Sequence, residues 1–438
     1  MQRTQLASLL ACLCLAMDAK AMTLLDAFTA AQAYDSQLAS ARGARDAALE
    51  KSTQGFAGLL PTVSATASIN RINADITIAN QDPIYRDYTQ QIYQLQLRQP
   101  IYNQNNFDVY EQSKLLVTAG EIQFERAKND LALRVSQAYF DVLTAQDTIS
   151  FIHAQKAAIT EQLESAKRNF EVGTATITDT HEAQARFDLA IAQEIAAQND
   201  LEVKRNAFAV VTGKLPPELK SLRSGVKLSS PEPSNMDKWV QSAEASNFSV
   251  VAQSLLADIA KLEIHRNRAG HLPTLDAVAA QSQRKDLTLT SPSTTNTTAV
   301  GLQLTIPLFT GFSTTSKIRE AIALENQARS DLDTAKRTAM QNARAAYLGV
   351  QSGLSQIRAL EAAEVSSNSA LESNKLGYDV GVRINIDVLN AQQQLYSTRR
   401  DLAKARYDTL VNGLRLKAAA GTLGEVDLAE LNALLDMR

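Results

Sequence analysis

The sequence predicts an α+β membrane protein made of two copies of one unit, with four β-strands per chain that several chains share in one barrel. Three observations predict it. Matching blocks recur in order at an almost constant offset, two proline-free stretches carry the apolar period of coiled coils, and proline-bounded intervals alternate apolar with polar residues as membrane strands do. Only 10 of the 438 residues are proline and 17 are glycine. Such sparse interruption favours long regular elements.

The first residues have the pattern of a secretory signal peptide. Arg3 precedes an apolar run from Leu6 to Met17, and Ala19-Lys20-Ala21 offers a small-x-small cleavage site. We therefore assign 1–21 to a signal peptide, with the mature chain starting at Met22, and a buried N-terminal helix is the alternative. Both cysteines of the sequence lie in this segment. The exported chain is then expected to have no disulfide or thiol chemistry.

The duplication is visible as paired blocks. Ala138-Tyr139-Phe140 matches Ala346-Tyr347-Leu348 at an offset of 208, and Val172-Gly173 matches Val380-Gly381 at the same offset. The prolines cluster at equivalent places in both halves. These matches divide the chain into a first repeat over 22–215, a proline-rich linker over 216–236 and a second repeat over 237–438.

Each repeat contains a predicted helical hairpin, at about 108–212 and at about 312–412. From Leu131 to Phe170 there is neither glycine nor proline, and apolar residues follow steps of four and three. A period of 3.5 residues indicates a coiled coil. Gly173 and Gly381 stand where a glycine commonly ends a helix. An ordinary helical bundle core is the alternative interpretation of the same stripe.

The intervals between prolines predict two β-hairpins, at about 62–100 and at about 274–307. At 93–98, for example, Tyr, Leu and Leu alternate with Gln, Gln and Arg. Segments of about ten residues with one apolar face are typical of membrane strands. A small soluble sheet with one solvated face is the alternative. The polar stretches 70–90 and 281–297 are predicted as the loops between these strands.

Four strands cannot close a barrel in lipid, because an open edge leaves backbone groups without hydrogen bonds. Several chains must therefore share one barrel. Two chains supply eight strands, and a barrel of that size is filled by side chains, whereas three chains supply twelve and leave a lumen wide enough for a solute. A cyclic homotrimer is expected.

Composition and motifs argue against several other function classes. Lys and Arg total 44 against 47 Asp and Glu, so no basic surplus is available for a nucleic-acid partner. The sequence has neither a phosphate-binding Gly-x-x-x-x-Gly-Lys loop nor a His-Glu-x-x-His zinc motif, and its four histidines are scattered. We expect no enzyme activity, no cofactor and no metal site.

Five motifs together carry a family resemblance. They are the Leu-Pro-x block before each β-hairpin, Ala-Tyr-Phe-x-Val-Leu at 138–143, Tyr378-Asp379-Val380-Gly381-Val382-Arg383, Ile386-Asp387-Val388-Leu389-Asn390-Ala391 and Leu423-Gly424-Glu425-Val426-Asp427-Leu428. Over essentially its whole mature length the chain resembles the TolC family of outer-membrane channel-tunnel proteins. The resemblance implies a homotrimer with a 12-stranded barrel in the outer membrane of a Gram-negative bacterium, continued by a long α-helical coiled-coil tunnel in the periplasm.

The resemblance also implies the function and the partners. The chain is expected to form the exit duct of a tripartite export machine that passes proteins, small toxic compounds or both, in type I secretion or drug efflux. The expected partners are a periplasmic membrane-fusion adaptor, an inner-membrane transporter of the ABC or RND type, and outer-membrane lipid. A soluble periplasmic or secreted coiled-coil scaffold is the alternative, which the helices alone would support and against which the strand pairs at equivalent places in both repeats argue.

A gate at the periplasmic end is implied by the same resemblance. Tyr378 and Arg383 match family residues that hold the tunnel closed, with Thr178 and Asp179 of the first repeat as their acceptors. N-capping of a helix is the alternative role for Asp179, because aspartate is favoured there by backbone N–H donors and the helix dipole.

The resemblance implies an acidic ring at the pore constriction. Asp387 matches the first acid of that ring, and helix capping is again the alternative role. The second acidic position is Asn390 in this sequence. The second ring is therefore expected to be neutral.

Four aromatic residues follow the strands closely: Tyr102, Phe107, Phe309 and Phe312. Aromatic side chains gather at the interfaces between membrane and water. These four are expected to form the girdle at the periplasmic interface, and packing in a core is the alternative.

Overall fold

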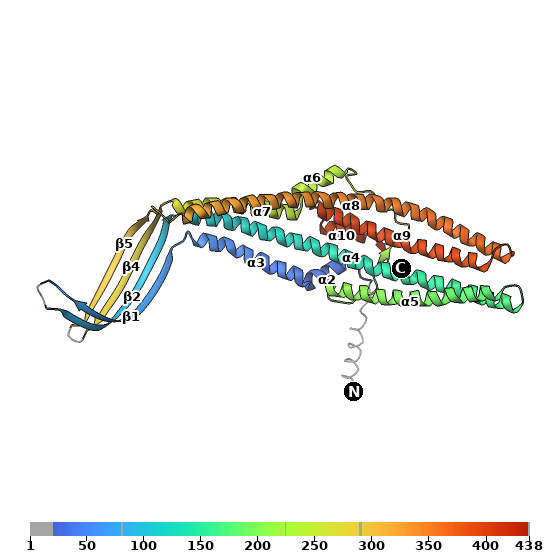
Figure 1. The fold of residues 1–438 in the computed structure, drawn as a ribbon, viewed down its shortest axis with the longest axis horizontal. Coiled ribbons are helices and arrows are strands. Elements are labelled where there is room, and N and C mark those ends of the chain that lie inside the picture. Colours follow the sequence, from blue (N-terminus) through green and yellow to red (C-terminus); the bar gives the residue numbers. More distant parts are fainter. Residues whose placement is uncertain (1–20, 80–81, 224, 289–290, 437–438) are drawn as a thin grey trace, which may run out of the picture. The chain divides into compact units, whose positions relative to one another are not determined.

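The computed structural model describes residues 21–79, 82–223, 225–288 and 291–436. The expected signal peptide, 1–21, thus lies almost wholly outside the described residues. The elements are, in chain order, α2 (Leu24–Tyr34), α3 (Ser36–Ala57), β1 (Thr62–Ile76), β2 (Ile84–Tyr102), α4 (Gln104–Glu171), α5 (Ile177–Thr212), β3 (Ser221–Leu222), α6 (Met236–Ser246), α7 (Phe248–Arg268), the 3-10 helix η1 (Ala269–His271), β4 (Thr274–Leu287), β5 (Ser293–Thr305), α8 (Ser313–Asp379), α9 (Asn385–Ala419), α10 (Glu425–Asn432) and β6 (Leu435–Asp436). Figure 1 labels most of them.

The order of the elements repeats along the chain. Two helices, two strands and two long helices occur as α2-α3-β1-β2-α4-α5 and again as α6-α7-β4-β5-α8-α9. The chain forms two compact units that cut across this order. A strand unit comprises Gly43–Gln123 and Val251–Thr334, and a helical unit comprises Met1–Arg42, Phe124–Val250 and Ala335–Arg438.

The strand unit contains one antiparallel sheet in the order β1-β2-β4-β5. Its strands have 15, 19, 14 and 13 residues, which is longer than the sequence pattern indicates. The expectation that 70–90 and 281–297 are loops is therefore wrong: Ile76 still pairs with Ile84, and Asp286 with Ser293. The ladder is made of main-chain hydrogen bonds, so it continues past the point where the apolar alternation ends.

The two outer strands of the sheet, β1 and β5, each pair on one side only within the described residues. All of β5 is exposed in the single chain, and its apolar side chains include Val300 at 82% and Leu302 at 69% exposure. A long apolar edge strand is a site for pairing with another chain.

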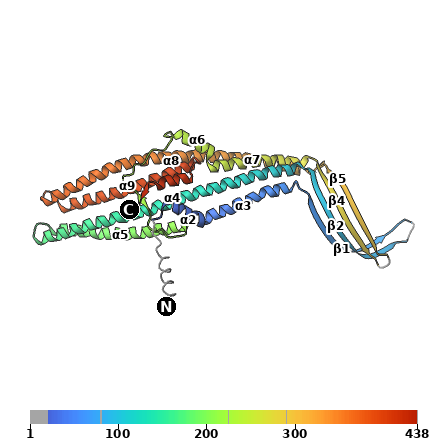
Figure 2. The ribbon, with the colours of Figure 1, turned by 180° about the vertical axis from the view of Figure 1, so that it is seen from behind.

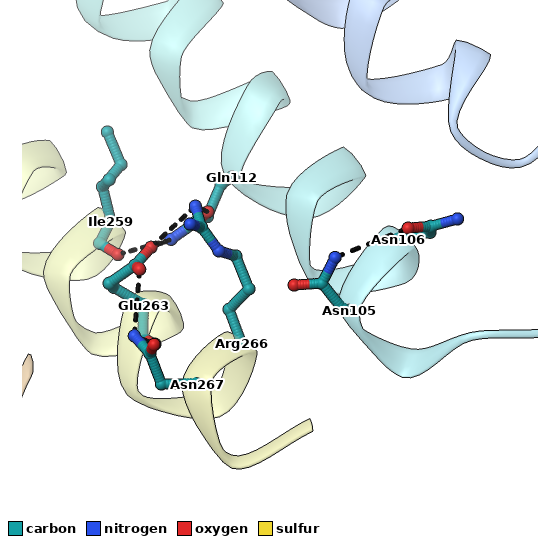
Figure 3. A network of polar contacts seen from close by, with 7 residues as sticks. All are labelled: Asn105, Asn106, Gln112, Ile259, Glu263, Arg266 and Asn267. Atoms are coloured by element: carbon teal, nitrogen blue, oxygen red, sulfur yellow. Dashed lines mark hydrogen bonds and ion pairs between the residues drawn. The ribbon is translucent and has the colours of Figure 1, made fainter. Parts of the chain in front are cut away.

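A polar network joins α4 to α7 in the strand unit (Figure 3). Gln112 is buried, and its Nε2 donates to the main-chain oxygen of Ile259 at 3.2 Å and to Glu263 Oε2 at 2.9 Å. Arg266 pairs with the same carboxylate at 3.0 Å, and Asn267 Nδ2 donates to Glu263 Oε1 at 2.9 Å. These bonds satisfy the buried amide, which would otherwise cost stability, and they hold the two helices that lead to and from the sheet.

The helical unit contains two long hairpins, one of α5 with the part of α4 from Phe124 onwards and one of α9 with the part of α8 from Ala335 onwards, and both views of the ribbon show the two helices of each hairpin running side by side (Figures 1 and 2). The apolar stripe of α4 is buried at Leu131, Val135 and Val142 and again at Ala166, whereas Phe170 near the turn is 44% exposed. The apolar period thus gives the packed face along most of the helix. Among the described helices, none has a window of 18 residues apolar enough to cross a membrane.

One tyrosine in each repeat ties a main-chain segment to the hairpins. The fully buried Tyr139 lies with its hydroxyl 3.0 Å from the main-chain oxygen of Met22 and 2.9 Å from that of Lys220. Tyr347, 208 residues later, donates to the main-chain oxygen of Ser234 at 2.8 Å. Burial raises the pKa of Tyr139 far above its usual value, so this hydroxyl stays a hydrogen-bond donor.

Candidate functional site at the two helical turns

Each long hairpin reverses at a glycine. Gly173 lies in the turn between α4 and α5 and Gly381 in the turn between α8 and α9, both with φ of +79°. This left-handed conformation is costly for residues with a Cβ atom. The sequence pattern therefore predicted both turns correctly, because the requirement for glycine depends only on the local backbone conformation.

The two turns have the same main-chain hydrogen bonds, displaced by 208 residues. Thr174 N and Ala175 N donate to the oxygen of Asn169 at 2.8 and 3.1 Å, and Val382 N and Arg383 N donate to the oxygen of Gly377 at 2.8 and 3.0 Å. The duplication is thus preserved in the backbone of both tips. Functional differences between the tips must come from side chains.

The two helices that follow the turns, α5 and α9, differ in how their N-termini are capped. In α5, Thr176 and Asp179 form a reciprocal capping box, with Thr176 N donating to Asp179 Oδ2 at 2.9 Å. The equivalent residues at α9 are Ile384 and Asp387, and isoleucine has no side-chain cap hydrogen bond to give. The carboxylate of Asp387 instead lies 3.6 Å from Arg383 Nη1. Capping therefore occupies Asp179, whereas Asp387 is available for an ion pair.

The structure places the four expected gate residues at the tips without joining the two pairs inside one chain. Tyr378 accepts a hydrogen bond from Asn169 Nδ2 of the other hairpin at 3.0 Å. Among the described contacts, Arg383 meets Asp387, Asp179 meets Thr176, and Thr178 is exposed. The links from Tyr378 and Arg383 to Thr178 and Asp179 stay a prediction for the assembled protein.

Asn385 is a contact residue that the sequence pattern did not identify. Its side chain is fully buried at the start of α9 and donates from Nδ2 to the main-chain oxygen of Asp179 at 3.3 Å. Its Oδ1 accepts from Gln162 Nε2 on α4. The signal that could have identified it is the difference between repeats, because the equivalent position in α5 is the apolar Ile177.

Asn390, the expected neutral position of the constriction, is bonded to an arginine from the other repeat. Arg186 on α5 donates from Nη2 to Asn390 Oδ1 at 2.9 Å and from Nη1 to Gln393 Oε1 at 2.6 Å. Asn390 also lines a groove of about 490 Å³ together with Arg383 and Asp387. Arg186 was not singled out from the sequence.

Lys156, the one interruption of the apolar period in α4, belongs to a polar cluster between α4 and α5. Its Nζ lies 2.6 Å from Glu194 Oε2, and His153 Nε2 lies 3.2 Å from Glu194 Oε1. The hydrogen bond from Lys156, together with the nearby positive charges, lowers the pKa of Glu194 below its usual value. Within the described part of the chain, no group of three or more His, Cys, Asp or Glu residues is placed to hold a metal ion.

The four expected girdle residues lie in the strand unit and all are exposed. Tyr102 ends β2, Phe107 lies in the first turn of α4, and Phe309 and Phe312 lie between β5 and α8. Phe309 and Phe312 pack edge to face with ring centroids 5.5 Å apart, and Phe312 has φ of +63°. Exposure to this extent argues against burial in a core of the single chain.

Comparison with known proteins decides the family. The family model described as outer membrane efflux protein matches residues 28–214 and 239–422, one match in each repeat. The chain belongs to the outer membrane efflux protein family. Within this family it is similar to the outer membrane protein TolC of Vibrio cholerae, with 33% identity over 417 residues that cover 94% of each chain.

A second relative and a solved structure agree with this assignment. The proteases secretion protein PrtF of Dickeya chrysanthemi is 32% identical over 428 residues, which cover 95% of this chain and 91% of the relative. The crystal structure of the outer membrane protein VceC from Vibrio cholerae superposes with a TM-score of 0.79 at 18% identity, covering 91% of this chain and 96% of that one. The resemblance to the TolC family is confirmed.

As a member of the efflux protein family with this fold, the chain is an outer-membrane exit duct. Its four strands are one share of a twelve-stranded trimeric barrel, and its helical hairpins form a periplasmic tunnel. The alternative of a soluble coiled-coil scaffold is not supported by these relatives. The family is a channel family.

Proposed function

We propose that three copies of this chain form one duct that receives cargo from an inner-membrane transporter through a periplasmic membrane-fusion adaptor. One observation carries the proposal: within the described residues, the strand at each edge of the four-stranded sheet pairs on one side only, and the same chain contains two long helical hairpins. Pairing β1 of one chain with β5 of the next satisfies both edges and closes the barrel.

The cargo is proposed to be secreted protein, small toxic compounds or both. The relative named for protease secretion supports the first class, and the efflux name of the family supports the second. An ABC transporter fits the first class and an RND-type transporter the second. Identifying the adaptor and transporter that co-purify with this chain decides between them.

We propose that the tips of the helical hairpins form the gate. Tyr378 and Arg383 hold the second hairpin inward by contacts with Thr178 and Asp179, within one chain or from a neighbouring one. The hydrogen bond between Tyr378 and Asn169 already brings the two tips together in a single chain. Asp387 and Asn390 then line the constriction, and the exposed aromatic residues Tyr102, Phe107, Phe309 and Phe312 contact lipid at the periplasmic interface.

Disulfide trapping tests the shared barrel. Because both cysteines lie at positions 12 and 14 of the expected signal peptide, the mature chain provides a cysteine-free background. A cysteine fixed at Gln303 in β5 and a second one scanned along β1 should give covalent dimers and trimers on oxidation. The matched control fixes the first cysteine at Gln283 in β4, which pairs with β2 and β5 and not with β1.

Native mass measurement in detergent complements the trapping. Three chains per particle are expected in extracts of the outer membrane. A stable monomer in the aqueous periplasmic fraction, or β1 cysteines that link equally well to β4 and β5, would contradict the shared barrel.

A further inference from the structure

Arg186 makes two hydrogen bonds that join the first repeat to the second. Its guanidinium, on α5, donates to Asn390 Oδ1 at 2.9 Å and to Gln393 Oε1 at 2.6 Å. Residues three apart on a helix lie on the same face, so both acceptors are presented side by side by α9. A planar guanidinium suits such a pair of oxygens better than a lysine ammonium does. The arginine is therefore held in one place beside Asn390.

The charges of this stretch do not cancel within one chain. Both acceptors of Arg186 are neutral amides, which accept two hydrogen bonds from the guanidinium without neutralising its charge. On α9 the single carboxylate of Asp387 lies 3.6 Å from Arg383. Among Arg186, Arg383 and Asp387 the formal charges sum to one positive charge per chain, and Arg186 is the cation of the three without a carboxylate partner among the described contacts.

Two acidic residues of α5, Asp188 and Glu182, lie near Arg186 along the chain. Asp188 is exposed and accepts from Gln184 within its own helix at 2.9 Å, and residues two apart on a helix do not share a face. Glu182 lies one turn before Arg186 on the same face of α5, half-buried and at the position equivalent to Asn390, but among the described residues no ion pair joins it to Arg186, whose guanidinium donates to Asn390 and Gln393. The acid occurs in the first repeat and the neutral amide in the second, so the duplicated positions differ in charge.

We propose that Arg186 determines the ion selectivity of the constriction, by placing a fixed positive charge behind the Asn390 ring and so favouring the passage of anions over cations. In a threefold assembly it supplies three guanidinium groups against three Asp387 carboxylates that Arg383 already offsets. The inference rests on the proposed function, because Asp387 and Asn390 line a lumen only in the assembled duct. A ring of like charges in a narrow pore sets which ion enters.

Reversal potentials of single channels in planar bilayers under a KCl gradient test the proposal. Arg186→Gln keeps hydrogen-bonding capacity and removes the charge, and it should raise the permeability ratio of K⁺ to Cl⁻ by about threefold at an ionic strength where charges about 10 Å apart are partly screened. Arg186→Lys keeps the charge and loses the planar fork, so its ratio should stay near that of the wild type.

Asn390→Asp provides a second, independent comparison. In the wild-type background the new carboxylate faces Arg186 and should change selectivity little, whereas in the Arg186→Gln background it should raise the K⁺ preference strongly. Such non-additivity requires that the two side chains interact. If Arg186 had a purely structural role, Asn390→Asp would change the K⁺/Cl⁻ permeability ratio equally in the two backgrounds.

The outcomes separate this proposal from the one on which it rests. If Arg186→Gln forms trimers and conducts with wild-type selectivity, or if Arg186→Lys shifts the ratio as much as Arg186→Gln does, the assignment of Arg186 is wrong and the duct stands. If the wild-type protein gives no discrete channels, the proposed duct fails and this inference fails with it.

Discussion

Asn385 offers the sharpest test of how the hairpins are held together. Its buried amide bonds to two elements of the first repeat, the oxygen of Asp179 at 3.3 Å and Gln162 on α4. Each neutral hydrogen bond contributes about 0.5–1.5 kcal/mol net, so Asn385→Ala should remove about 1–3 kcal/mol per chain. If the open state separates α9 from the first hairpin, the ratio of closed to open entrances falls by about 5- to 150-fold.

Single-channel conductance in planar bilayers measures that change. Asn385→Ala should spend more time at high conductance than the wild type. Asn385→Asp should go further, because it replaces the donor that faces the Asp179 oxygen with an acceptor. Asn374→Ala is the matched control, since Asn374 lines the groove that Asp387 also lines and, among the described contacts, its amide donates to the main-chain oxygen of Ala370 in its own helix, at 3.0 Å.

Two results would refute this reasoning. Wild-type conductance of both Asn385 variants would mean that opening does not break these bonds. Equal opening by Asn374→Ala would mean that any change in the groove loosens the tip, so that the bonds between repeats have no special part.

Three further predictions concern the gate and the stability of the trimer. Arg383→Ser combined with Tyr378→Phe should raise single-channel conductance, and wild-type conductance would contradict the gate assignment. Tyr139→Phe should lower trimer stability by about 1–2 kcal/mol, seen as a lower melting midpoint, because a buried oxygen loses its donor. Burial by itself raises the pKa of Asp35, but hydrogen bonds from Arg134 and from a backbone N–H outweigh it and the net pKa is lowered. The stabilisation that ionised Asp35 gives is therefore present above about pH 4 and is lost as pH falls through the lower pKa of the folded state. Asp35→Asn should therefore have a lower melting temperature than the wild type at pH 7 and should lose less stability on acidification. Parallel pH profiles of the two proteins would contradict this.

Local features of this fold could be predicted from the sequence because their causes are local. Gly173 and Gly381 mark turns because few other residues tolerate a left-handed backbone, and the stripe from Leu131 along α4 marks its packed face because side chains repeat with the helical period. The strands were recognised by alternation, and their ends were misplaced because pairing continues through residues such as Ile76 that lie beyond the alternating stretch.

Contacts across the duplication could not be predicted in the same way. Arg186 and Asn390 are 204 residues apart, and no periodicity within either helix states which helix packs on which. The polar role of Asn385 depends likewise on Gln162 from another element. The family resemblance pointed to residues that lie at the helical tips, but it could not supply side-chain partners that are specific to this sequence.

The unequal caps of α5 and α9 have a consequence for local unfolding. Thr176 and Asp179 complete the first turn of α5 from within that turn, so this helix end keeps its order whether or not another hairpin is docked. The first turn of α9 has Ile384 at the cap and depends on the bonds of Asn385 to the other repeat. Amide hydrogens at the start of α9 should therefore exchange with solvent faster than those of α5 once the hairpins part. The duplication has thus produced one tip whose helix start is capped from within its own turn and one whose helix start is held by contacts with the other repeat.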